Sequence, residues 1–253
     1  MKILGIIPAR YASSRFPAKA LANLGGKSVI ERVYKQAAKT QVIRKLMVAT
    51  DHREIYDHVT GFGGNVMLTS TEHRSGTDRC VEVVRKLEEK FDYVINIQGD
   101  EPFVSPESID TLADLLDRQT QIATLIKPIE SADTLFDPNV VKVVKNTLNE
   151  AIYFSRSTIP FLRGKKQEDW LGEHPFYKHL GIYGYRTDIL LQIASLSVSL
   201  LEKAESLEQL RWLENGFTIK VAETHLESLG IDTPEDFEKA KDYIKKQIKG
   251  RIP

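Results

Sequence analysis

The sequence predicts an α/β protein built on a mixed, mainly parallel sheet, and two observations lead to this prediction. Short apolar runs of strand length recur along the first half of the chain, and longer amphipathic segments lie between them. Such alternation pairs successive strands in parallel and covers both sheet faces with helices. With 253 residues, 42% of them hydrophobic, and no repeat or linker, we expect one domain, residues 1–253.

The elements of the first half follow from their periodicity. The expected strands are residues 3–7, 45–49, 65–68, 93–97 and 122–126. A helix is expected at 28–39, where Val29, Ile30, Val33 and Ala37 repeat at helical spacing. A second helix is expected at 77–89 on the spacing of its own apolar residues, Cys80, Val83, Val84 and Leu87.

The second half changes character, because its short β-like runs are joined by loops instead of full helices. These runs are residues 140–144, 151–154 and 180–185, and they predict a mixed sheet and an elaborated second half. Residues 162–175 lack periodicity and are expected to form a surface excursion, either a subunit contact or a plain loop. A helix is expected at 200–215, ended by Gly216, and a last helix from Pro234 to about Lys249.

Composition excludes several classes of protein. Thirty-five basic residues balance thirty-five acidic ones, so we expect no nucleic-acid or membrane partner, and any anion site must be a local cluster. A single cysteine, Cys80, excludes an intramolecular disulfide and a cysteine-based zinc site. Nothing near Met1 is typical of an export signal, and we expect the protein to be cytoplasmic.

A carboxylate follows directly after the expected strand at 93–97. The segment 98–102 reads Gln-Gly-Asp-Glu-Pro, which places Asp100 at the carboxyl edge of a parallel sheet, where α/β proteins bind their ligands. A carboxylate there is suited to holding Mg²⁺ against substrate phosphates. Because Gly-Asp pairs also end strands for backbone reasons, an ordinary acidic turn is an alternative from this segment alone.

The first expected strand leads into a basic loop, residues 8–19, which contains Arg10, Arg15 and Lys19. Arginine offers forked donors to phosphate oxygens and lysine a compact charge, so the loop is suited to a polyphosphate. It has neither the Walker pattern nor the Gly-x-Gly-x-x-Gly pattern of dinucleotide-binding folds. A solvated basic loop is the alternative reading.

Eight motifs in order resemble those of the 3-deoxy-manno-octulosonate cytidylyltransferase family, across essentially the whole chain. They are Ile-Pro-Ala-Arg-Tyr-Ala-Ser-Ser-Arg at 7–15, Ala-Thr-Asp at 49–51, Ser-Gly-Thr-Asp-Arg at 75–79, Gln-Gly-Asp-Glu-Pro at 98–102, Tyr-Phe-Ser-Arg at 153–156, His-Leu-Gly-Ile-Tyr-Gly-Tyr at 179–185, Leu-Glu-Gln-Leu-Arg at 207–211 and Ile-Asp-Thr-Pro-Glu-Asp at 231–236. The resemblance implies a Rossmann-like nucleotidyltransferase fold.

The resemblance also implies the reaction. The family transfers CMP from CTP to the anomeric hydroxyl of Kdo (3-deoxy-D-manno-octulosonate), an acidic sugar of lipopolysaccharide, and releases pyrophosphate. It requires Mg²⁺ and forms homodimers, so CTP, Kdo and a second copy of the chain are the implied partners. In-line nucleotidyl transfer needs positioning and charge neutralisation but no protein nucleophile.

Site residues are carried over from the family position by position. Arg10, Arg15 and Lys19 would hold the triphosphate, and Ser75, Gly76 and Arg79 the cytidine. Asp100 and Asp232 would bind Mg²⁺. The implied acceptor pocket comprises Gln98, Arg156, His179, Tyr183, Glu208 and Gln209.

Two nearby acidic residues have other readings. Asp78 is expected to be structural, because a carboxylate at a helix start complements the helix dipole. Asp232 has a competing role as the N-cap of the last helix, and spacing alone does not pair it with Asp100.

The sequence leaves alternatives to this activity open. A CMP-sialic acid synthetase also uses CTP, but its phosphate loop typically carries Gly-Ser-Lys-Gly where this chain has Ala-Ser-Ser-Arg. A binding-only protein that has kept the fold is the second rival, and a Kdo analogue altered at carbon 8 is an alternative acceptor. Many relatives have Gly and Pro around the loop lysine, whereas this chain has Ala18 and Ala20.

Overall fold

The chain divides into two units, Met1–Asp110 with Ser228–Pro253 and Thr111–Glu227, called here the first and the second unit. The computed structural model describes residues 1–12, 15–73, 75–226 and 229–249. Among these residues, no helix combines the length and the apolar content needed to cross a membrane.

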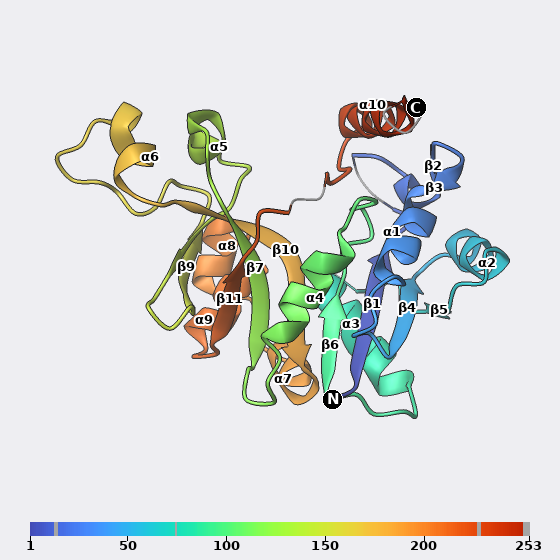
Figure 1. The fold of residues 1–253 in the computed structure, drawn as a ribbon. Helices are drawn as coiled ribbons and strands as arrows, with labels where there is room; N and C mark the ends of the chain where they lie inside the picture. Colours follow the sequence, from blue (N-terminus) through green and yellow to red (C-terminus); the bar gives the residue numbers. More distant parts are fainter. Residues whose placement is uncertain (13–14, 74, 227–228, 250–253) are drawn as a thin grey trace. The chain divides into compact units, whose positions relative to one another are not determined.

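The first unit is built on a parallel sheet. Its central strand β1 (Ile3–Ala9) lies between β4 (Lys45–Thr50) and β6 (Tyr93–Asn96), and β5 (Val66–Leu68) pairs with the outer side of β4 (Figure 1). All these pairs are parallel, so the carboxyl ends of the strands meet at one edge. The strands predicted in this region are confirmed to within two residues. Strands β1, β4 and β6 are largely buried apolar runs, whereas β5 is apolar but only partly buried.

The remaining elements of the first unit are the helices α1 (Val29–Ala37), α2 (Arg53–Gly61), α3 (Gly76–Lys86) and α10 (Pro234–Lys249), the 3₁₀ turn η1 (Lys19–Leu21) and the short hairpin of β2 (Asn23–Leu24) and β3 (Lys27–Ser28). The helix α4 (Pro106–Asp114) contains the chain position at which the units divide. The expected helices α1, α3 and α10 are confirmed, and α2 and α4 are additional. Ser28 caps α1 by accepting from the Glu31 amide at 3.1 Å.

The second unit is built on a mixed sheet, as predicted. Strand β7 (Ile122–Pro128) pairs in parallel with β11 (Ile219–Glu223) and antiparallel with β10 (Tyr177–Arg186). Strand β8 (Lys142–Lys145) pairs antiparallel with both β10 and β9 (Ala151–Ser155). The sequence did not predict β11, although its alternating burial is typical of a strand.

The helices of the second unit are α5 (Ala132–Phe136), η2 (Gln167–Asp169), α6 (Trp170–Glu173), α7 (Thr187–Ile193), α8 (Leu200–Glu205) and α9 (Glu208–Glu214). The prediction of one helix at 200–215 is wrong. Ser206 adopts the left-handed conformation, with φ 53°, and divides the segment into α8 and α9. Gly216 follows α9 with φ 80°, as expected for a residue that ends a helix.

The excursion at 162–175 is more ordered than a plain loop. It carries η2 and α6, and Trp170 is buried to 2% exposure. The indole packs in a small core with Ile129, Leu135 and Phe176. This core fixes the excursion on the second unit.

A close backbone approach joins the ends of β1 and β6 in the first unit. A Cβ atom on Gly99 would lie 2.3 Å from the carbonyl oxygen of Pro8, which is far inside van der Waals contact. Only glycine lets the chain pass β1 here and turn into Asp100. The glycine that precedes the candidate carboxylate is therefore required by packing.

We predict that Gly99→Ala lowers the free energy of unfolding by about 1–3 kcal/mol, because the new methyl group meets backbone that cannot rotate away. Urea unfolding followed by circular dichroism measures the change. The control is Gly61→Ala at the end of α2, where a Cβ meets nothing within 4 Å. Equal stability of the two variants would contradict the proposed steric constraint.

Candidate functional site

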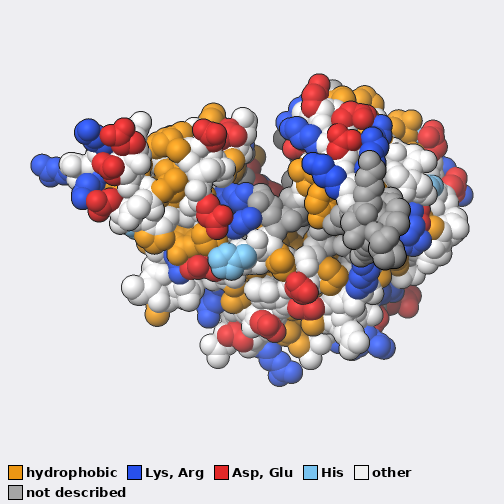
Figure 2. Space-filling model, turned by 45° about the horizontal axis from the view of Figure 1, so that its top comes forward, with side chains coloured by type: hydrophobic (Ala, Val, Ile, Leu, Met, Phe, Trp, Pro, Cys, Tyr) orange, Lys and Arg blue, Asp and Glu red, His pale blue; other side chains and the backbone are white. Residues whose placement is uncertain are grey.

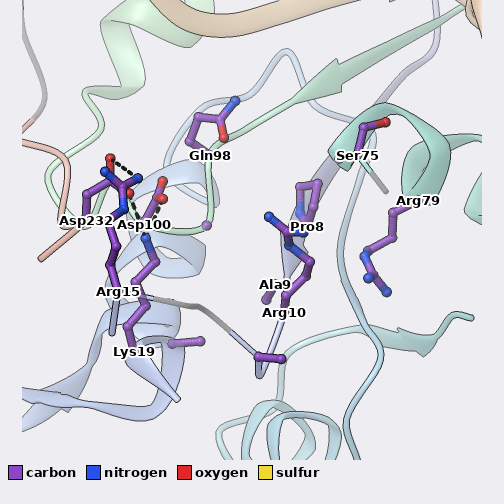
Figure 3. Close-up of a pocket in the computed structure, with 14 residues that line it drawn as sticks. Pro8, Ala9, Arg10, Arg15, Lys19, Ser75, Arg79, Gln98, Asp100 and Asp232 are labelled. Carbon is purple, nitrogen blue, oxygen red and sulfur yellow. Dashed lines mark hydrogen bonds and ion pairs between the residues drawn. The ribbon is translucent and has the colours of Figure 1, made fainter. Parts of the chain in front are cut away.

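The ammonium group of Lys19 holds together three parts of the first unit. Its Nζ donates to Asp100 Oδ2 at 2.7 Å, to the carbonyl oxygen of Ile231 at 2.7 Å and to Asp232 Oδ1 at 3.2 Å. Arg15 Nη2 lies 3.3 Å from the other oxygen of Asp232. The structure therefore brings together two carboxylates and two cations that the sequence proposed as one site (Figure 3).

Asp232 reaches this cluster because another residue caps α10. The Thr233 hydroxyl accepts from the Asp236 amide at 3.2 Å, and Asp236 Oδ2 accepts from the Thr233 amide at 3.1 Å. The alternative that Asp232 is the N-cap is thus wrong. Its carboxylate turns instead toward Lys19, while the Ile231 amide donates to the Asp100 carbonyl oxygen at 2.9 Å.

The conformation of Ala18 sets the direction of Lys19. Ala18 has φ 56° and ψ 21°, in the left-handed region that favours glycine. Its amide donates to the Tyr11 carbonyl oxygen at 2.9 Å, which closes the loop. The glycine expected from the family at this position therefore has a conformational reason, which alanine meets with some backbone strain. Ser13 and Ser14 of the same motif lie outside the described residues.

A cavity of about 420 Å³ opens beside this cluster at the carboxyl edge of the parallel sheet. Four basic and two acidic side chains line it, which favours an anionic ligand over a neutral one. Its lining comprises Pro8, Ala9, Arg10, Ala12, Arg15, Lys19, Ala20, Ser75, Gly76, Arg79, Gln98, Gly99, Asp100 and Asp232. All eight triphosphate, cytidine and metal residues proposed from the sequence are among them, together with Gln98.

Figure 3 shows how the lining residues divide. On one side of the end of β1 lie Asp100, Asp232, Arg15 and Lys19, and on the other side lie Ser75 and Arg79. Arg10, at the end of β1, lies between the two groups and is exposed. A long ligand with several negative charges can contact both sides of such a cavity.

The start of α3 is fixed by a capping box. The Ser75 hydroxyl accepts from the Asp78 amide at 3.1 Å, and the Asp78 carboxylate accepts from the Ser75 amide at 3.3 Å. The structural role predicted for Asp78 is confirmed. Arg79 is only 1% exposed although it lines the cavity, and its Nη2 donates to Asp51 Oδ2 at 2.9 Å.

Glu82 on α3 ties down the segment that precedes this helix. It accepts from the Ser70 amide at 2.8 Å, contacts His73 Nε2 and lies 2.6 Å from Lys86 Nζ. Burial favours a raised pKa for Glu82, but the hydrogen bonds from Lys86, Ser70 and His73 outweigh it and lower the pKa to about 2. Sequence reasoning missed this anchor, because Glu82 reads as an ordinary helix residue.

The acceptor residues proposed from the sequence, apart from Gln98, lie in the second unit. A bulge in β10 between Leu180 and Tyr183 pairs His179 with Ile126 and Tyr183 with Thr124, two residues apart on β7. The two side chains therefore share a face of the sheet, and their ring centroids are 5.1 Å apart.

Two buried donors of the second unit are unsatisfied. The Tyr183 hydroxyl and Gln209 Nε2 have no hydrogen-bond partner within the part of the chain that the structure describes. Both side chains are 6% exposed, and an unpaired buried donor costs about 1–3 kcal/mol. Burial, aided by the charge of Glu208, raises the pKa of Tyr183 well above its usual value. The hydroxyl is thus a neutral donor, suited to a polar ligand.

Arg156 is held against α8. Its Nε donates to the Glu205 carbonyl oxygen at 2.8 Å and its Nη1 to the Pro138 carbonyl oxygen at 3.3 Å, while its amide donates to Glu205 Oε2 at 2.9 Å. Glu208 Oε1 accepts from Arg211 at 2.8 Å. These residues are anchored within the second unit, and their anchoring matches either a binding or a structural role.

Lys142 is a buried cation that sequence reasoning missed. Its side chain is fully buried, and Nζ donates to the carbonyl oxygens of Asp137, Val140 and Arg156 at 2.8, 2.7 and 2.5 Å. Burial lowers the pKa of Lys142, against the opposing charges of Asp137 and Glu205. The ammonium fixes the backbone at Arg156 from within the unit, a role that a lysine in a β-like run does not reveal.

The comparisons with known proteins agree on one family. The family model described as cytidylyltransferase matches residues 4–223. A 3-deoxy-manno-octulosonate cytidylyltransferase of Parabacteroides distasonis is 56% identical over 96% of this chain and 98% of its own, and one of Cytophaga hutchinsonii is 55% identical over 93% and 95%. A solved structure of CMP:2-keto-3-deoxy-manno-octonic acid synthetase complexed with CTP matches with a TM-score of 0.91 and 40% identity, over 98% of this chain and 100% of that chain.

We predict that His179→Gln removes part of the acid sensitivity of the fold. Burial lowers the pKa of His179 to about 3, so the folded state stays neutral while the unfolded state, with its usual pKa near 6.5, takes up a proton. Stability from this residue is complete above pH 6.5 and is lost as the pH falls toward 3. Between pH 7 and pH 5 the wild type should lose about 1–2 kcal/mol more than the variant.

Urea unfolding at several pH values measures this difference. His225→Gln is the control, because this exposed histidine lies in the same unit, and that variant should keep the wild-type pH dependence. Parallel pH profiles for the wild type and His179→Gln would contradict the prediction.

Proposed function

Because the chain belongs to the 3-deoxy-manno-octulosonate cytidylyltransferase family, we propose that it transfers CMP from CTP to the anomeric hydroxyl of Kdo and releases pyrophosphate. The observation that supports this most directly is the cavity in which Lys19, Arg15, Asp100 and Asp232 converge. It joins a cationic lining to a carboxylate pair, as nucleotidyl transfer requires.

The basic residues of the cavity stabilise negative charge during the reaction. The Kdo hydroxyl attacks the α-phosphorus of CTP in line, and negative charge builds up on the departing pyrophosphate. Arg10, Arg15 and Lys19 line the same cavity and stabilise this charge, while the cavity walls hold the reacting groups in place. Lys19 pairs with Asp100 and Asp232, so it has to exchange partners to hold the triphosphate.

The carboxylate pair fits Mg²⁺, which we include in the proposal. Asp100 and Asp232 both contact the single Nζ atom of Lys19, so one cation can reach an oxygen of each. The described residues contain no group of three or more His, Cys, Asp or Glu that could hold a metal by itself. Mg²⁺ is commonly held by one or two carboxylates plus water and substrate phosphates. When bound, the ion would neutralise phosphate charge.

For the sugar, we propose contacts with the residues that the family resemblance implies. Arg156 is suited to the Kdo carboxylate, and Tyr183 and Gln209 offer buried donors to its hydroxyl groups. His179 shares the sheet face of Tyr183, and Glu208 precedes Gln209 on α9. Gln98 lines the nucleotide cavity. A Kdo analogue altered at carbon 8 is the second candidate acceptor. We place the reaction in the cytoplasm.

Pyrophosphate release from the purified protein with CTP and Mg²⁺ tests the proposal. Kdo, its 8-amino analogue, N-acetylneuraminate and a reaction without sugar are compared. We expect release with Kdo. Preference for another sugar would keep the chemistry and change the acceptor, whereas CTP binding without release would favour the binding-only alternative.

We predict that Asp100→Asn lowers turnover by at least about 100-fold while the protein stays folded, because one carboxylate of the pair loses its charge. The same pyrophosphate assay measures the effect. Asp242→Asn is the matched control, since it removes a carboxylate from an exposed pair with Lys245 in the same unit. Wild-type rates in Asp100→Asn would refute its role.

We also propose that the protein forms a homodimer through the second unit. Phe161 is 73% exposed and Phe136 38% exposed, and both rings lie against Trp170. Figure 2 shows hydrophobic side chains gathered over the segment that carries α5 and α6. Exposed apolar groups of this kind mark contact surfaces, and the family implies a second copy as the occupant.

We predict that Phe161→Asp shifts the protein from dimer to monomer at micromolar concentration, because a charge would be buried in the contact. Light scattering during size-exclusion chromatography measures the mass. Val198→Asp, which alters another exposed apolar residue of the second unit at 48% exposure, should remain dimeric. A monomeric wild type would refute the proposal.

A further inference from the structure

Asp51 bridges two segments of the first unit that line opposite sides of the cavity. Its Oδ1 accepts from the Tyr11 amide at 3.2 Å, and its Oδ2 accepts from Arg79 Nη2 at 2.9 Å. The residue follows directly after β4, at the carboxyl edge of the parallel sheet. It does not line the cavity itself, and nothing in the proposed chemistry uses it.

On one side, the bridge fixes Arg79. The guanidinium is buried, and its Nη1 contacts the Thr69 hydroxyl and donates to the Ser70 carbonyl oxygen at 3.3 Å. Asp51 supplies the opposing charge that this buried cation needs. Because Arg79 belongs to the first turns of α3, its position also fixes Ser75 and Gly76. We call these three residues the nucleoside wall.

On the other side, the bridge fixes Tyr11 at the base of the basic loop. The Tyr11 ring stacks on His52, with centroids 3.7 Å apart and planes inclined by 18°. Its sequence neighbours Arg10 and Ala12 line the cavity. The Ala18 amide bonds to the Tyr11 carbonyl oxygen, so the loop leaves and returns at this residue.

Tyr11 therefore anchors both ends of this loop, which contains Arg15, follows Arg10 and precedes Lys19. We call these three basic residues the phosphate wall. A nucleoside triphosphate is one covalent ligand that has to meet both walls at once. When one ligand contacts two sites, the second contact adds to the affinity only if the spacing of the two sites matches the ligand. A single carboxylate that contacts both walls is placed to set that spacing.

We propose that Asp51 is a positioning residue that holds the phosphate wall and the nucleoside wall at the separation that CTP requires. The proposal rests on the proposed function, because it takes CTP as the ligand. A carboxylate is needed for this role, since two oxygens must accept from two donors. An asparagine has one acceptor oxygen, so its NH2 group would face either the Tyr11 amide or the Arg79 donors.

The test compares the binding of CTP and CMP to Asp51→Asn by isothermal titration calorimetry. CMP meets the nucleoside wall with one phosphate, whereas CTP needs both walls. We expect the Kd for CTP to rise at least about 10-fold and the Kd for CMP to change less than about 3-fold. An unchanged Kd for CTP, or equal weakening of both ligands, would overturn the proposal.

A matched control is Asp57→Asn, which removes an exposed carboxylate that pairs with Arg53 at 2.9 Å on the neighbouring helix α2. It should bind CTP and CMP as the wild type does. If Asp57→Asn also weakens the binding of CTP more than that of CMP, the effect of Asp51→Asn is one of overall charge and the proposal fails.

Asp51→Asn leaves Arg79 buried without an opposing charge, so the double variant Asp51→Asn/Arg79→Met is measured beside Arg79→Met. Breaking the bridge from the Arg79 end should also reduce the preference for CTP over CMP. Once Arg79 is absent, replacing Asp51 should reduce that preference no further. A further loss would show that Asp51 acts apart from the bridge and would overturn the proposal. Absence of CTP binding to the wild type would instead refute the proposed function.

Discussion

The three hydrogen bonds of the Lys19 ammonium are the constraint on which the candidate site depends. They join the N-terminal loop to the turn after β6 and to the segment before α10, which are distant in sequence. These bonds depend on three local features: the left-handed backbone at Ala18, the turn that Gly99 allows and the cap of α10 that Thr233 takes over. The site is therefore a product of local backbone chemistry at three separate points.

The charges of this cluster are balanced, within a protein whose formal net charge is also zero. Lys19 and Arg15 lie against Asp100 and Asp232, so the four side chains together carry no formal net charge. A cation that occupies the carboxylates would release Lys19 and Arg15 toward the phosphates. In the proposed function, binding of a metal and binding of the triphosphate would then favour each other, because each removes the other's competitor.

Much of the fold could be predicted from the sequence where a local pattern decides the structure. The strand before Asp100 is a buried apolar run, and a structural role for Asp78 follows from its place near the start of α3. The helix break at Ser206 could not be predicted, because serine rarely adopts the left-handed conformation and nothing in its neighbours indicates it.

The candidate site was less accessible to such reasoning. No spacing rule pairs Asp100 with Asp232, and spacing favoured a cap for the latter; the resemblance supplied the pairing that the geometry shows. Asp51 and Lys142 act through contacts made only in the folded chain, so no local pattern reveals them. The buried, unpaired donors of Tyr183 and Gln209 likewise become visible only when the surroundings are known.

The left-handed backbone at Ala18 limits how this site can vary. A β-branched side chain such as valine or threonine is sterically excluded from that conformation, so either would rotate the peptide that leads into Lys19. Glycine, asparagine and aspartate fit, but aspartate would place a third carboxylate beside the cluster. A single nucleotide change at this codon could therefore misdirect the lysine while leaving every charged residue of the site in the sequence.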